Sequence, residues 1–425
     1  MAWWAFGPGV FGDDERMNRL QKVDRKTLML LGGICYLLPV IEKAHKYGYR
    51  VITVDYIPDN VAHKYSDEYY NISILDKDAV LGLAQKQHID GILSFAVDPG
   101  VVTAAYVAEK MGLPFSCSYE SACTLQNKAL FRQFLTDHHF NVPTAKGYSS
   151  MDDALKDVGF FHWPVIVKPV DSAGSKGITR VDSPEKLEKA IRTALGESHN
   201  QSFIIEDYLE KEGLSSGSES FFVDGKLMYN GFYDQFFDVN AANPYTPSAE
   251  CWPADKPESV LDEVRSELQR LGDLLHFGTG LFNVEWRVCT DGKVYLMEVS
   301  PRAGGNRLAE ILNYAADVDL IDAEVRKAMG EEVSGIHEPK YQGCYAIQVL
   351  HPSTTGKFKE IDLNPTFEEK YVIEKEIRIR KGDRVDAFTG ANSAIGTLFL
   401  KTKERVEMQS LLEGIDRYVK VSLGE

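Results

Sequence analysis

The chain has 425 residues, 44% of them hydrophobic and 26% charged, which is ordinary for a soluble globular protein with two or three domains. Its net charge of −16 and its lack of a basic cluster argue against nucleic acid or an anionic membrane as the main partner, because both are bound by neutralising phosphates. The six cysteines show neither CxxC nor zinc spacing, so we expect reduced thiols in a cytoplasmic protein. No apolar run approaches the ~18 residues that indicate a membrane span.

The first sixteen residues, MAWWAFGPGVFGDDER, differ in character from the rest of the chain. They are aromatic and glycine-rich, lack a basic segment and match no signal-peptide layout. We interpret residues 1–16 as an extension, with Met17 as the alternative start, and leave them out of the fold prediction.

Strand-like and helical segments alternate from Lys26 onward. In chain order they are strand TLMLLGG, a helix over residues 34–47, strand YRVITVDY, helix AVLGLAQKQ, strand DGILSF and helix VVTAAYVAEKMG. This succession predicts a Rossmann-like α/β domain over residues 17–125, with a parallel sheet and crossover helices on both faces. The GxGxxG fingerprint of a dinucleotide site is absent after the first strand, which leaves the crevice as an alternative place for part of a substrate.

The central part of the chain begins with a helix at Asn127, followed by two strands around a small-residue loop. A helix with Ser183 as N-cap and Pro184 at its first position comes next, then strand FIIEDYL and a hairpin turning at Asp224-Gly225. Residues 232–258 have no clear period and predict a long functional or disordered loop. Helix VLDEVRSELQRLGDLL follows, and residues 340–425 are rich in short strands. We divide this part of the chain into units at residues 126–209, 210–340 and 341–425.

The dipeptide Asp291-Gly292 predicts a second hairpin, because it lies between two strand-like runs in the segment FNVEWRVCTDGKVYLMEVS. A two-residue turn there would pair Thr290 with Lys293. The resulting register pairs Val288 with Tyr295, Trp286 with Met297 and Val284 with Val299 on one face, and Glu285 with Glu298 and Asn283 with Ser300 on the other.

The facing carboxylates of Glu285 and Glu298 suggest a metal site. Side chains in that position have Cβ atoms roughly 5 Å apart, and like charges there are destabilising. A hard divalent cation held by oxygens would relieve the repulsion. The alternative is two solvated glutamates on an exposed hairpin.

Two further segments could hold a nucleotide. Residues 171–177, DSAGSKG, lie between two strands, and small residues let backbone N–H groups approach phosphate oxygens. Lys168 and Lys176 would add positive charge, although a flexible hairpin tip is the alternative interpretation. In FIIEDYL, Glu206 and the backbone around Tyr208 and Leu209 would suit a purine edge, unless the segment is an ordinary strand end.

The order of these pieces resembles the ATP-grasp superfamily, most of all its carboxylate–amine ligases that join amino acids. The segments that carry the resemblance are VKPVDSAGSKGI, IIEDYLE, ESFFVDGK, FNVEWRV and MEVSPRAGG. The resemblance covers nearly the whole chain from Lys26. It implies an ATP-grasp fold: the N-terminal Rossmann-like domain, a small lid domain, and a larger antiparallel-sheet domain that makes the C-terminal parts α+β.

The resemblance also implies roles for individual residues. Nucleotide-binding residues would be Lys128, Lys168, Ser172, Gly174, Ser175, Lys176, Gly177, Glu206, Tyr208, Leu209 and Glu219, the last at the ribose. Glu285 and Glu298 would bind Mg²⁺ or Mn²⁺. Ser300 stands where the family usually has asparagine, and a hydroxyl can ligate a metal or a metal-bound water. Arg302 would steady the transferring phosphoryl group or the acyl phosphate, and Lys168 would be the second catalytic residue.

Substrate contacts are predicted at Glu250, Gly304, Gly305 and Arg307. Glu250 resembles an acidic position that some amino-acid ligases place near the substrate amine, with a solvated loop glutamate as the alternative. Gly304 and Gly305 follow the predicted arginine. Arg302 or Arg307 could clamp a substrate carboxylate in bidentate fashion, although Arg307 could equally be a surface helix residue.

The implied activity is an ATP- and Mg²⁺-dependent ligation of a small-molecule carboxylate to an amine through an acyl phosphate, with release of ADP and phosphate. Phosphoryl transfer requires mainly positioning and charge neutralisation, which metal ions, lysine and arginine supply. One alternative is a purine-pathway or carbamoyl-phosphate-like enzyme that forms carboxy or formyl phosphate. Another is a nucleotide-binding sensor without turnover. A homodimer is left open.

Overall fold

The computed structural model describes residues 25–172, 174 and 176–424. The predicted extension over residues 1–16, the first residues of the predicted N-terminal domain and the nucleotide-binding prediction for Ser175 lie outside the described residues. In the described part of the chain, no helix is both long and apolar enough to cross a lipid bilayer.

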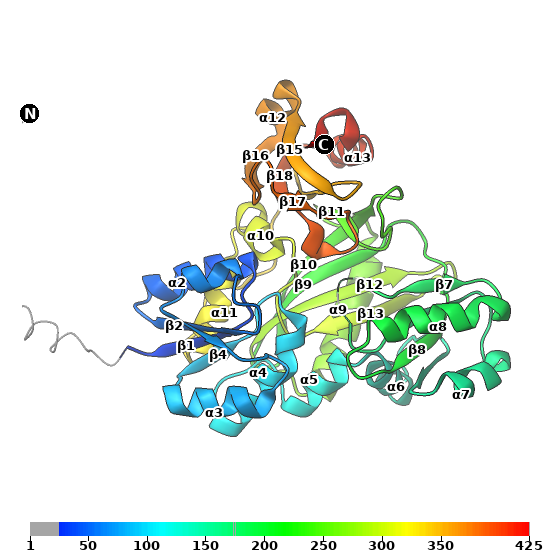
Figure 1. The fold of residues 1–425 in the computed structure, drawn as a ribbon, viewed down its shortest axis with the longest axis horizontal. Helices are drawn as coiled ribbons and strands as arrows, with labels where there is room; N and C mark the ends of the chain where they lie inside the picture. The colour runs from blue at the N-terminus through cyan, green and yellow to red at the C-terminus, as the bar shows by residue number, and fades with distance from the viewer. Residues whose placement is uncertain (1–24, 173, 175, 425) are drawn as a thin grey trace, which may run out of the picture.

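The N-terminal domain is the predicted parallel sheet covered on both faces (Figure 1). Its strands are β1 (Thr27–Leu31), β2 (Arg50–Asp55), β3 (Glu68–Asn71) and β4 (Gly91–Leu93), in the order β3-β2-β1-β4. Its helices are α2 (Leu38–Lys46), α3 (Lys77–Gln87) and α4 (Asp98–Met111), with short 3-10 turns at Cys35–Leu37 and Val61–Lys64. Alternate residues of β1 pack into different cores, Leu28 and Leu30 with α2, and Met29 and Leu31 with α3 and α4. Strand β3 was not predicted, because its residues EYYN are half-exposed and carry no apolar alternation.

Two helices, α5 (Tyr119–Gln126) and α6 (Lys128–Asp137), lead out of this domain. The helix start predicted at Asn127 is confirmed, because its side-chain oxygen accepts hydrogen bonds from the backbone N–H groups of Ala129 and Leu130. Helix α5 was not predicted.

A small antiparallel sheet follows, in the order β5-β8-β6-β7. It consists of β5 (Ala145–Tyr148), β6 (Val165–Pro169), β7 (Thr179–Val181) and β8 (Phe203–Asp207), with helices α7 (Met151–Lys156) and α8 (Leu187–Gly196). We call residues 145–207 the lid unit. Ser183 is an N-cap residue followed by Pro184 at the first helical position, as predicted, but they begin a 3-10 turn over Pro184–Lys186 that leads into α8, and the Ser183 side chain makes no capping hydrogen bond.

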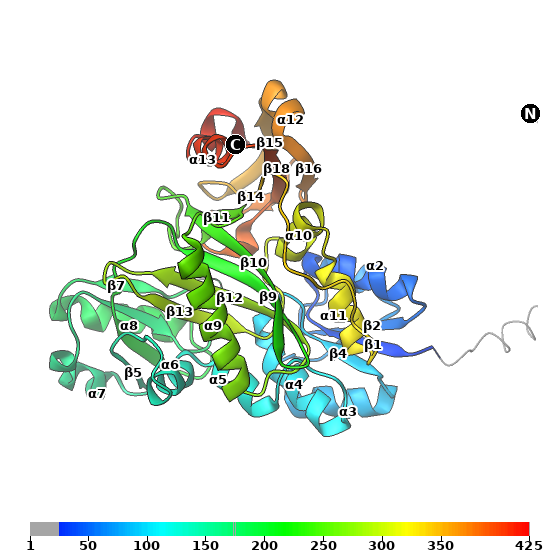
Figure 2. The same ribbon diagram turned by 180° about the vertical axis from the view of Figure 1, so that it is seen from behind.

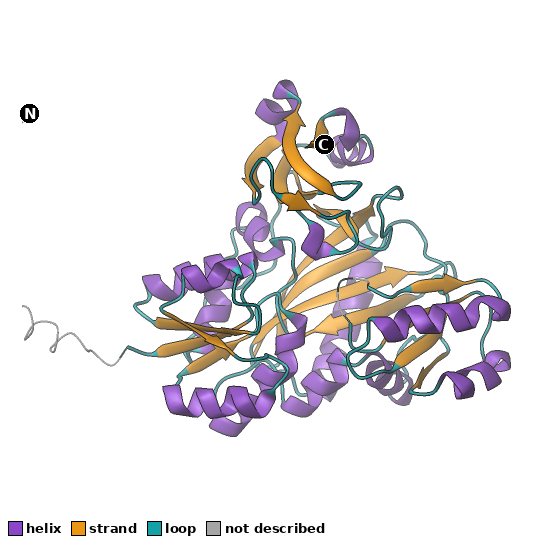
Figure 3. Cartoon of the chain, viewed as in Figure 1, coloured by secondary structure: helices purple, strands orange, loops and turns teal. Residues whose placement is uncertain are grey.

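An eight-stranded sheet lies between the N-terminal domain and the lid unit (Figures 1 and 3). In spatial order, its strands are β13 (Val294–Ser300), β12 (Gly280–Val288), β9 (Ser216–Val223), β10 (Lys226–Phe237), β11 (Pro247–Trp252), β14 (Cys344–Leu350), β18 (Gly396–Thr402) and β16 (Val372–Ile377). Helix α9 (Glu258–Leu274) packs on one face, as Figure 2 shows from behind. Helices α10 (Leu308–Ala316) and α11 (Leu320–Ala328) join this sheet to the N-terminal domain in one core.

The long loop predicted over residues 232–258 is largely wrong. Strand β10 continues to Phe237, and β11 occupies Pro247–Trp252. Residues 229–236 of β10 are buried on both faces of the sheet, so the sequence there shows no alternation between apolar and polar residues.

The C-terminal part adds a three-stranded sheet in the order β17-β15-β19. Its elements are β15 (Gly356–Leu363), β17 (Arg384–Val385), β19 (Val419–Gly424), α12 (Pro365–Tyr371) and α13 (Arg405–Glu413). The other three C-terminal strands, β14, β16 and β18, continue the central sheet past residue 340.

Candidate functional site

The predicted pair of glutamates is present on the β12–β13 hairpin. Glu285 lies directly opposite Glu298, with Asn283 opposite Ser300 and Val284 opposite Val299, as predicted. Trp286, Val284 and Val299 are buried on the other face against α9. The buried aromatic and aliphatic face therefore fixes the side of the sheet on which the two carboxylates lie.

The half of the hairpin nearer the turn has a different register from the one predicted. Trp286 pairs with Leu296, not Met297, and Val288 pairs with Val294, not Tyr295. The turn is one residue longer than predicted, since the Cys289 N–H donates to the Lys293 carbonyl and Gly292 has φ 75°. A β-bulge between Glu285 and Trp286 adds one residue to β13 and restores the predicted register at the glutamates.

The electrostatics around Glu285 favour a nearby cation. Burial raises the pKa of Glu285, and the neighbouring Glu298 carboxylate raises it further. Lys128, the first residue of α6, lies 3.4 Å from Glu298 through its Nζ atom. The same Nζ donates a 3.1 Å hydrogen bond to the Ser172 carbonyl, which links the hairpin to the small-residue loop.

Arg132, Lys168 and Glu206 form a buried cluster of charged side chains. Lys168 on β6 contacts the Glu206 carboxylate at 2.6 Å, and Arg132 on α6 lies 2.8 Å from the other carboxylate oxygen. Burial alone would raise the pKa of Glu206, but the charges of Arg132 and Lys168 outweigh it and lower the pKa to about 2. Arg132 also donates a 2.8 Å hydrogen bond to the carbonyl of Met297, at the bulge. Glu206 thus holds Lys168 in place, a contact that the sequence did not indicate.

The described part of the 171–177 loop contains two glycines in the left-handed backbone region. Gly174 and Gly177 both have φ 69°, a region that side chains rarely adopt. The Ser172 carbonyl accepts the hydrogen bond from Lys128, and Lys176 is exposed. The nucleotide-binding roles of these residues stay predictions.

The segment after β8 offers fewer free groups to a purine than expected. The Glu206 carboxylate is bound to two cationic side chains, and the Tyr208 N–H donates to the Pro164 carbonyl at 2.9 Å. The Tyr208 ring lies 4.3 Å from the Arg180 guanidinium, and Leu209 is half-buried beside it. Recognition of a purine here would use the remaining backbone groups.

Arg302 is held by a residue of the N-terminal domain. Its Nε and Nη2 atoms lie 2.7 Å and 2.5 Å from one oxygen of Asp98, the first residue of α4. The Ser300 hydroxyl donates to the same oxygen at 3.0 Å and accepts from the Gln126 amide at 2.6 Å. Direct metal ligation by Ser300 would therefore compete with two existing hydrogen bonds. Neither Asp98 nor Gln126 was singled out from the sequence.

Glu219 lies in the interior, beside the segment that follows Arg302. Its two oxygens accept the Gly304 N–H at 3.0 Å and 3.1 Å, and Asn283 donates to it at 2.7 Å. Burial raises the pKa of Glu219 to about 7. A Cβ at Gly304 would lie 2.4 Å from Leu308 and 2.7 Å from Glu219, so a larger residue would displace these side chains. The ribose contact predicted for Glu219 stays a prediction, and its contacts among the described residues are structural.

Glu250 is buried on β11, not in a solvated loop. The Asn306 amide donates to its Oε1 at 2.8 Å, and Oε2 has no hydrogen-bond partner among the described residues. Burial raises the pKa of Glu250 to about 8, and the charge of Glu285 adds to the effect. The substrate role of Glu250 stays a prediction; the solvated alternative is wrong.

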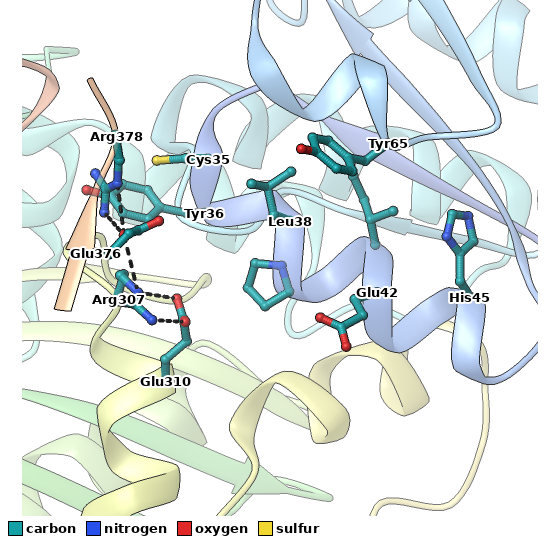
Figure 4. A pocket seen from close by; sticks show the side chains of 12 residues that line it. Cys35, Tyr36, Leu38, Glu42, His45, Tyr65, Arg307, Glu310, Glu376 and Arg378 are labelled. Carbon is teal, nitrogen blue, oxygen red and sulfur yellow. Dashed lines mark hydrogen bonds and ion pairs between the residues drawn. The ribbon is translucent and has the colours of Figure 1, made fainter. Parts of the chain in front are cut away.

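Arg307 faces a different cavity from the glutamate pair (Figure 4). It donates to Glu310, Glu374 and Thr397, and its guanidinium lies 4.4 Å from the Phe399 ring. This cavity, of about 390 Å³, lies between α2, α10 and β16. The glutamates already neutralise Arg307, which leaves little of its charge for a substrate carboxylate. A Cβ at Gly305 would lie 3.6 Å from the ring of Tyr36, which lines this cavity.

The donor set at the hairpin fits a hard divalent cation bound together with phosphate. Within the described residues, no three His, Cys, Asp or Glu side chains gather closely enough to hold a metal ion by themselves. Two carboxylates can fill part of an octahedral Mg²⁺ shell, with phosphate oxygens and water completing it. The raised pKa of Glu285 indicates that a positive charge there would be favourable.

Comparison with known proteins identifies the arrangement. Residues 161–310 match the ATP-grasp domain family. The carbamoyl phosphate synthase large chain of Clostridium perfringens is 23% identical over 352 residues, which cover 78% of this chain and 32% of that protein. The formate-dependent phosphoribosylglycinamide formyltransferase of Methanocaldococcus jannaschii is 25% identical over 87% of this chain and 91% of that protein.

The fold also matches solved structures. The L-amino acid ligase of Bacillus licheniformis superposes with a TM-score of 0.78 at 18% identity, over 94% of this chain and 99% of that one. This chain spans about a third, or less, of the carbamoyl phosphate synthase large chains that it matches. Residues 161–310 form an ATP-grasp domain, and the chain as a whole has the ATP-grasp fold.

Proposed function

We propose that this protein is an ATP- and Mg²⁺-dependent ligase that joins a small-molecule carboxylate to an amine and releases ADP and phosphate. The observation that carries the proposal is the position of Glu298. It lies opposite Glu285, and Lys128 bridges it to the Ser172 carbonyl of the glycine-containing loop. This contact would bring the proposed metal ligands and the proposed phosphate-binding loop together.

The side chains have separate tasks in the reaction. Glu285 and Glu298 would hold Mg²⁺, or Mn²⁺ in its place, which neutralises charge on the β- and γ-phosphates. Lys128 and Lys168 position the phosphates, and Glu206 keeps Lys168 from turning away. Arg302 stabilises the charge that develops as the γ-phosphoryl group moves to the substrate carboxylate. The resulting acyl phosphate has phosphate as its leaving group, which the amine displaces.

Two observations support amino acids or related metabolites as substrates: the fold matches that of an L-amino acid ligase, and Glu250 is buried. A buried carboxylate with one unpartnered oxygen would bind a substrate ammonium group. All six cysteines are unpaired, in keeping with the reduced cytoplasmic setting that we propose.

A second candidate is an enzyme that forms carboxy or formyl phosphate. The sequence similarity to carbamoyl phosphate synthase and to the formate-dependent formyltransferase favours it. In both candidates the ATP site would be the same, and only the acceptor would differ.

ADP release separates these candidates. The protein is incubated with Mg²⁺-ATP and a panel of amino-acid pairs, bicarbonate and formate with amine acceptors. Amino-acid-dependent ADP formation supports the first proposal, and dependence on bicarbonate or formate supports the second. Tight ATP binding without turnover for any acceptor contradicts both and favours a nucleotide sensor.

The Glu298→Gln variant tests the metal site. It keeps the size of the side chain but removes the charge, so turnover should fall at least 100-fold while the melting temperature stays within a few degrees. Glu188→Gln, at an exposed position of α8, is the matched control. Equal turnover in the Glu298→Gln variant and the control would rule out the site.

A further inference from the structure

The N-terminal domain contributes one carboxylate to the proposed reaction centre. Asp98 comes from the start of α4, whereas Arg302 follows β13 in the ATP-grasp domain, 204 positions later. Two other ion pairs between the N-terminal domain and the second half of the chain, Lys26–Glu331 and Lys43–Asp319, are more exposed, with side-chain exposures of 47% and 43% and of 24% and 36%. The Arg302 side chain is 8% exposed, and that of Asp98 is 20% exposed.

The contacts of Arg302 fix the direction of its guanidinium. An arginine has five N–H donors in a planar fork. The Nε edge faces Asp98, and Nη1 donates to the Ala303 carbonyl at 2.8 Å. These contacts use at most three donors, so one N–H on each terminal nitrogen remains for a ligand. We call the side of the guanidinium that carries Nη1 and Nη2 its outer edge. Two N–H groups there have the bidentate geometry that suits a phosphoryl group or carboxylate.

Asp98 also fixes the neighbouring backbone. The Ser300 hydroxyl donates to the same Asp98 oxygen, and Gln126 at the end of α5 donates to Ser300. Ser300 is two residues from Glu298 on β13, so one carboxylate organises the segment that carries both the predicted metal ligand and the predicted arginine. If Asp98 served only to hold the two domains together, its bond to Arg302 or its bond to Ser300 would be enough.

We propose that Asp98 is a positioning residue for the reaction: it orients the outer edge of Arg302 toward the transferring phosphoryl group and locks the Ser300–Arg302 segment beside Glu298. This inference rests on the proposed ligase function. Because nucleotide binding depends on the lid unit and Lys128, loss of Asp98 should slow the chemical step while leaving ATP affinity nearly unchanged.

A double-mutant cycle tests whether Asp98 acts through Arg302. The variants are Asp98→Ala, Arg302→Lys and their combination, with Asp98→Asn as a milder change that keeps one oxygen acceptor. We expect Asp98→Ala to lower kcat at least tenfold with the KM for ATP within threefold, and Asp98→Asn to lie between it and the wild type. The double variant should be no more than about twofold slower than the slower single variant. If the two fold-losses in kcat multiply in the double variant, Asp98 and Arg302 act independently, and the proposal is contradicted.

Asp78→Asn is the matched control, since Asp78 lies in the same domain and accepts one exposed hydrogen bond from Tyr106. Its kcat should be unchanged. If Asp98→Ala lowers only the melting temperature, with kcat per folded molecule intact, Asp98 is a structural tie and the proposal is overturned.

Hydrogen exchange provides a measurement that does not depend on turnover. The backbone N–H groups of Ser300 and of residues 302–305 should exchange at least tenfold faster in Asp98→Asn than in the wild type, and no faster in Asp78→Asn. If the wild type shows no turnover with any substrate, the proposed function fails, and faster exchange still shows that Asp98 orders this segment. Unchanged exchange overturns the positioning role whatever the activity.

Discussion

Single side chains at the site fall into two groups that differ in charge balance. Glu206 is matched by Arg132 and Lys168, and its pKa is lowered to about 2. Glu250 has no cationic partner among the described residues, and its pKa is raised to about 8. A carboxylate that is already neutralised organises its neighbours, whereas one that is not will favour the arrival of a positive charge.

The raised pKa of Glu250 makes stability depend on pH. Between about pH 4.5 and 8 the folded state holds a proton that the unfolded state has lost, so the contribution of this carboxyl group to stability falls as pH rises. Each pH unit costs up to about 1.4 kcal/mol. We expect Glu250→Gln to gain stability over the wild type as pH rises from 5 to 8, measured by urea unfolding in EDTA. A difference that is constant over this range would contradict the assignment.

Lys128 gives a second test at the residue scale. Lys128→Gln removes the charge that bridges Glu298 and the Ser172 carbonyl. A charge-assisted hydrogen bond is worth about 1.5–3 kcal/mol, so the Kd for Mg²⁺-ATP should rise about 10- to 100-fold. Calorimetric titration measures this change. Lys189→Gln, at an exposed position of α8, should bind as the wild type does.

Among the secondary-structure elements, the β12–β13 hairpin shows which features could be predicted from the sequence and which could not. The facing glutamates were predicted although the turn was one residue too short, because the bulge after Glu285 compensated for it. Alternating residues specify which face is buried, but they do not reveal a bulge or a three-residue turn. The contacts of Arg302 with Asp98 and of Glu206 with Arg132 join distant segments, which one sequence cannot show.

The segment after β13 depends on a glycine. Gly304→Ala would place a methyl group within 2.7 Å of Glu219 and 2.4 Å of Leu308, and would displace the Gly304 N–H from its acceptor. We expect a loss of about 1–3 kcal/mol in unfolding free energy together with a large fall in turnover. Gly82→Ala in α3, where a Cβ meets nothing within 4 Å, is the control. It should be neutral or slightly stabilising.

For the whole molecule, the central sheet joins parts that the sequence suggested were separate. The parallel α/β domain and the strand-rich C-terminal region were both predicted correctly as classes of structure. The sharing of one sheet was not predicted, because strand order depends on contacts between segments far apart in the chain. Tyr345, Ile347 and Phe399, all beyond residue 340, are buried in the same core as Leu281 and Ile311.

Truncation tests this continuity. A chain that ends at residue 340 would lose β14 and β18 and expose the edge of β11 together with a large apolar surface. We expect no cooperative thermal transition by circular dichroism and differential scanning calorimetry. A cooperative transition near that of the full chain would show that the part up to residue 340 folds without residues 341–425 and would contradict this account.

The central claim is that Glu285 and Glu298 hold the metal of a metal–ATP complex. Electron paramagnetic resonance of Mn²⁺, titrated into the protein with a non-hydrolysable ATP analogue, tests it without requiring a substrate. We expect bound Mn²⁺ in the wild type and at least tenfold weaker binding in Glu285→Gln and Glu298→Gln, with Glu188→Gln unchanged. Equal Mn²⁺ affinity in all four proteins would contradict the claim.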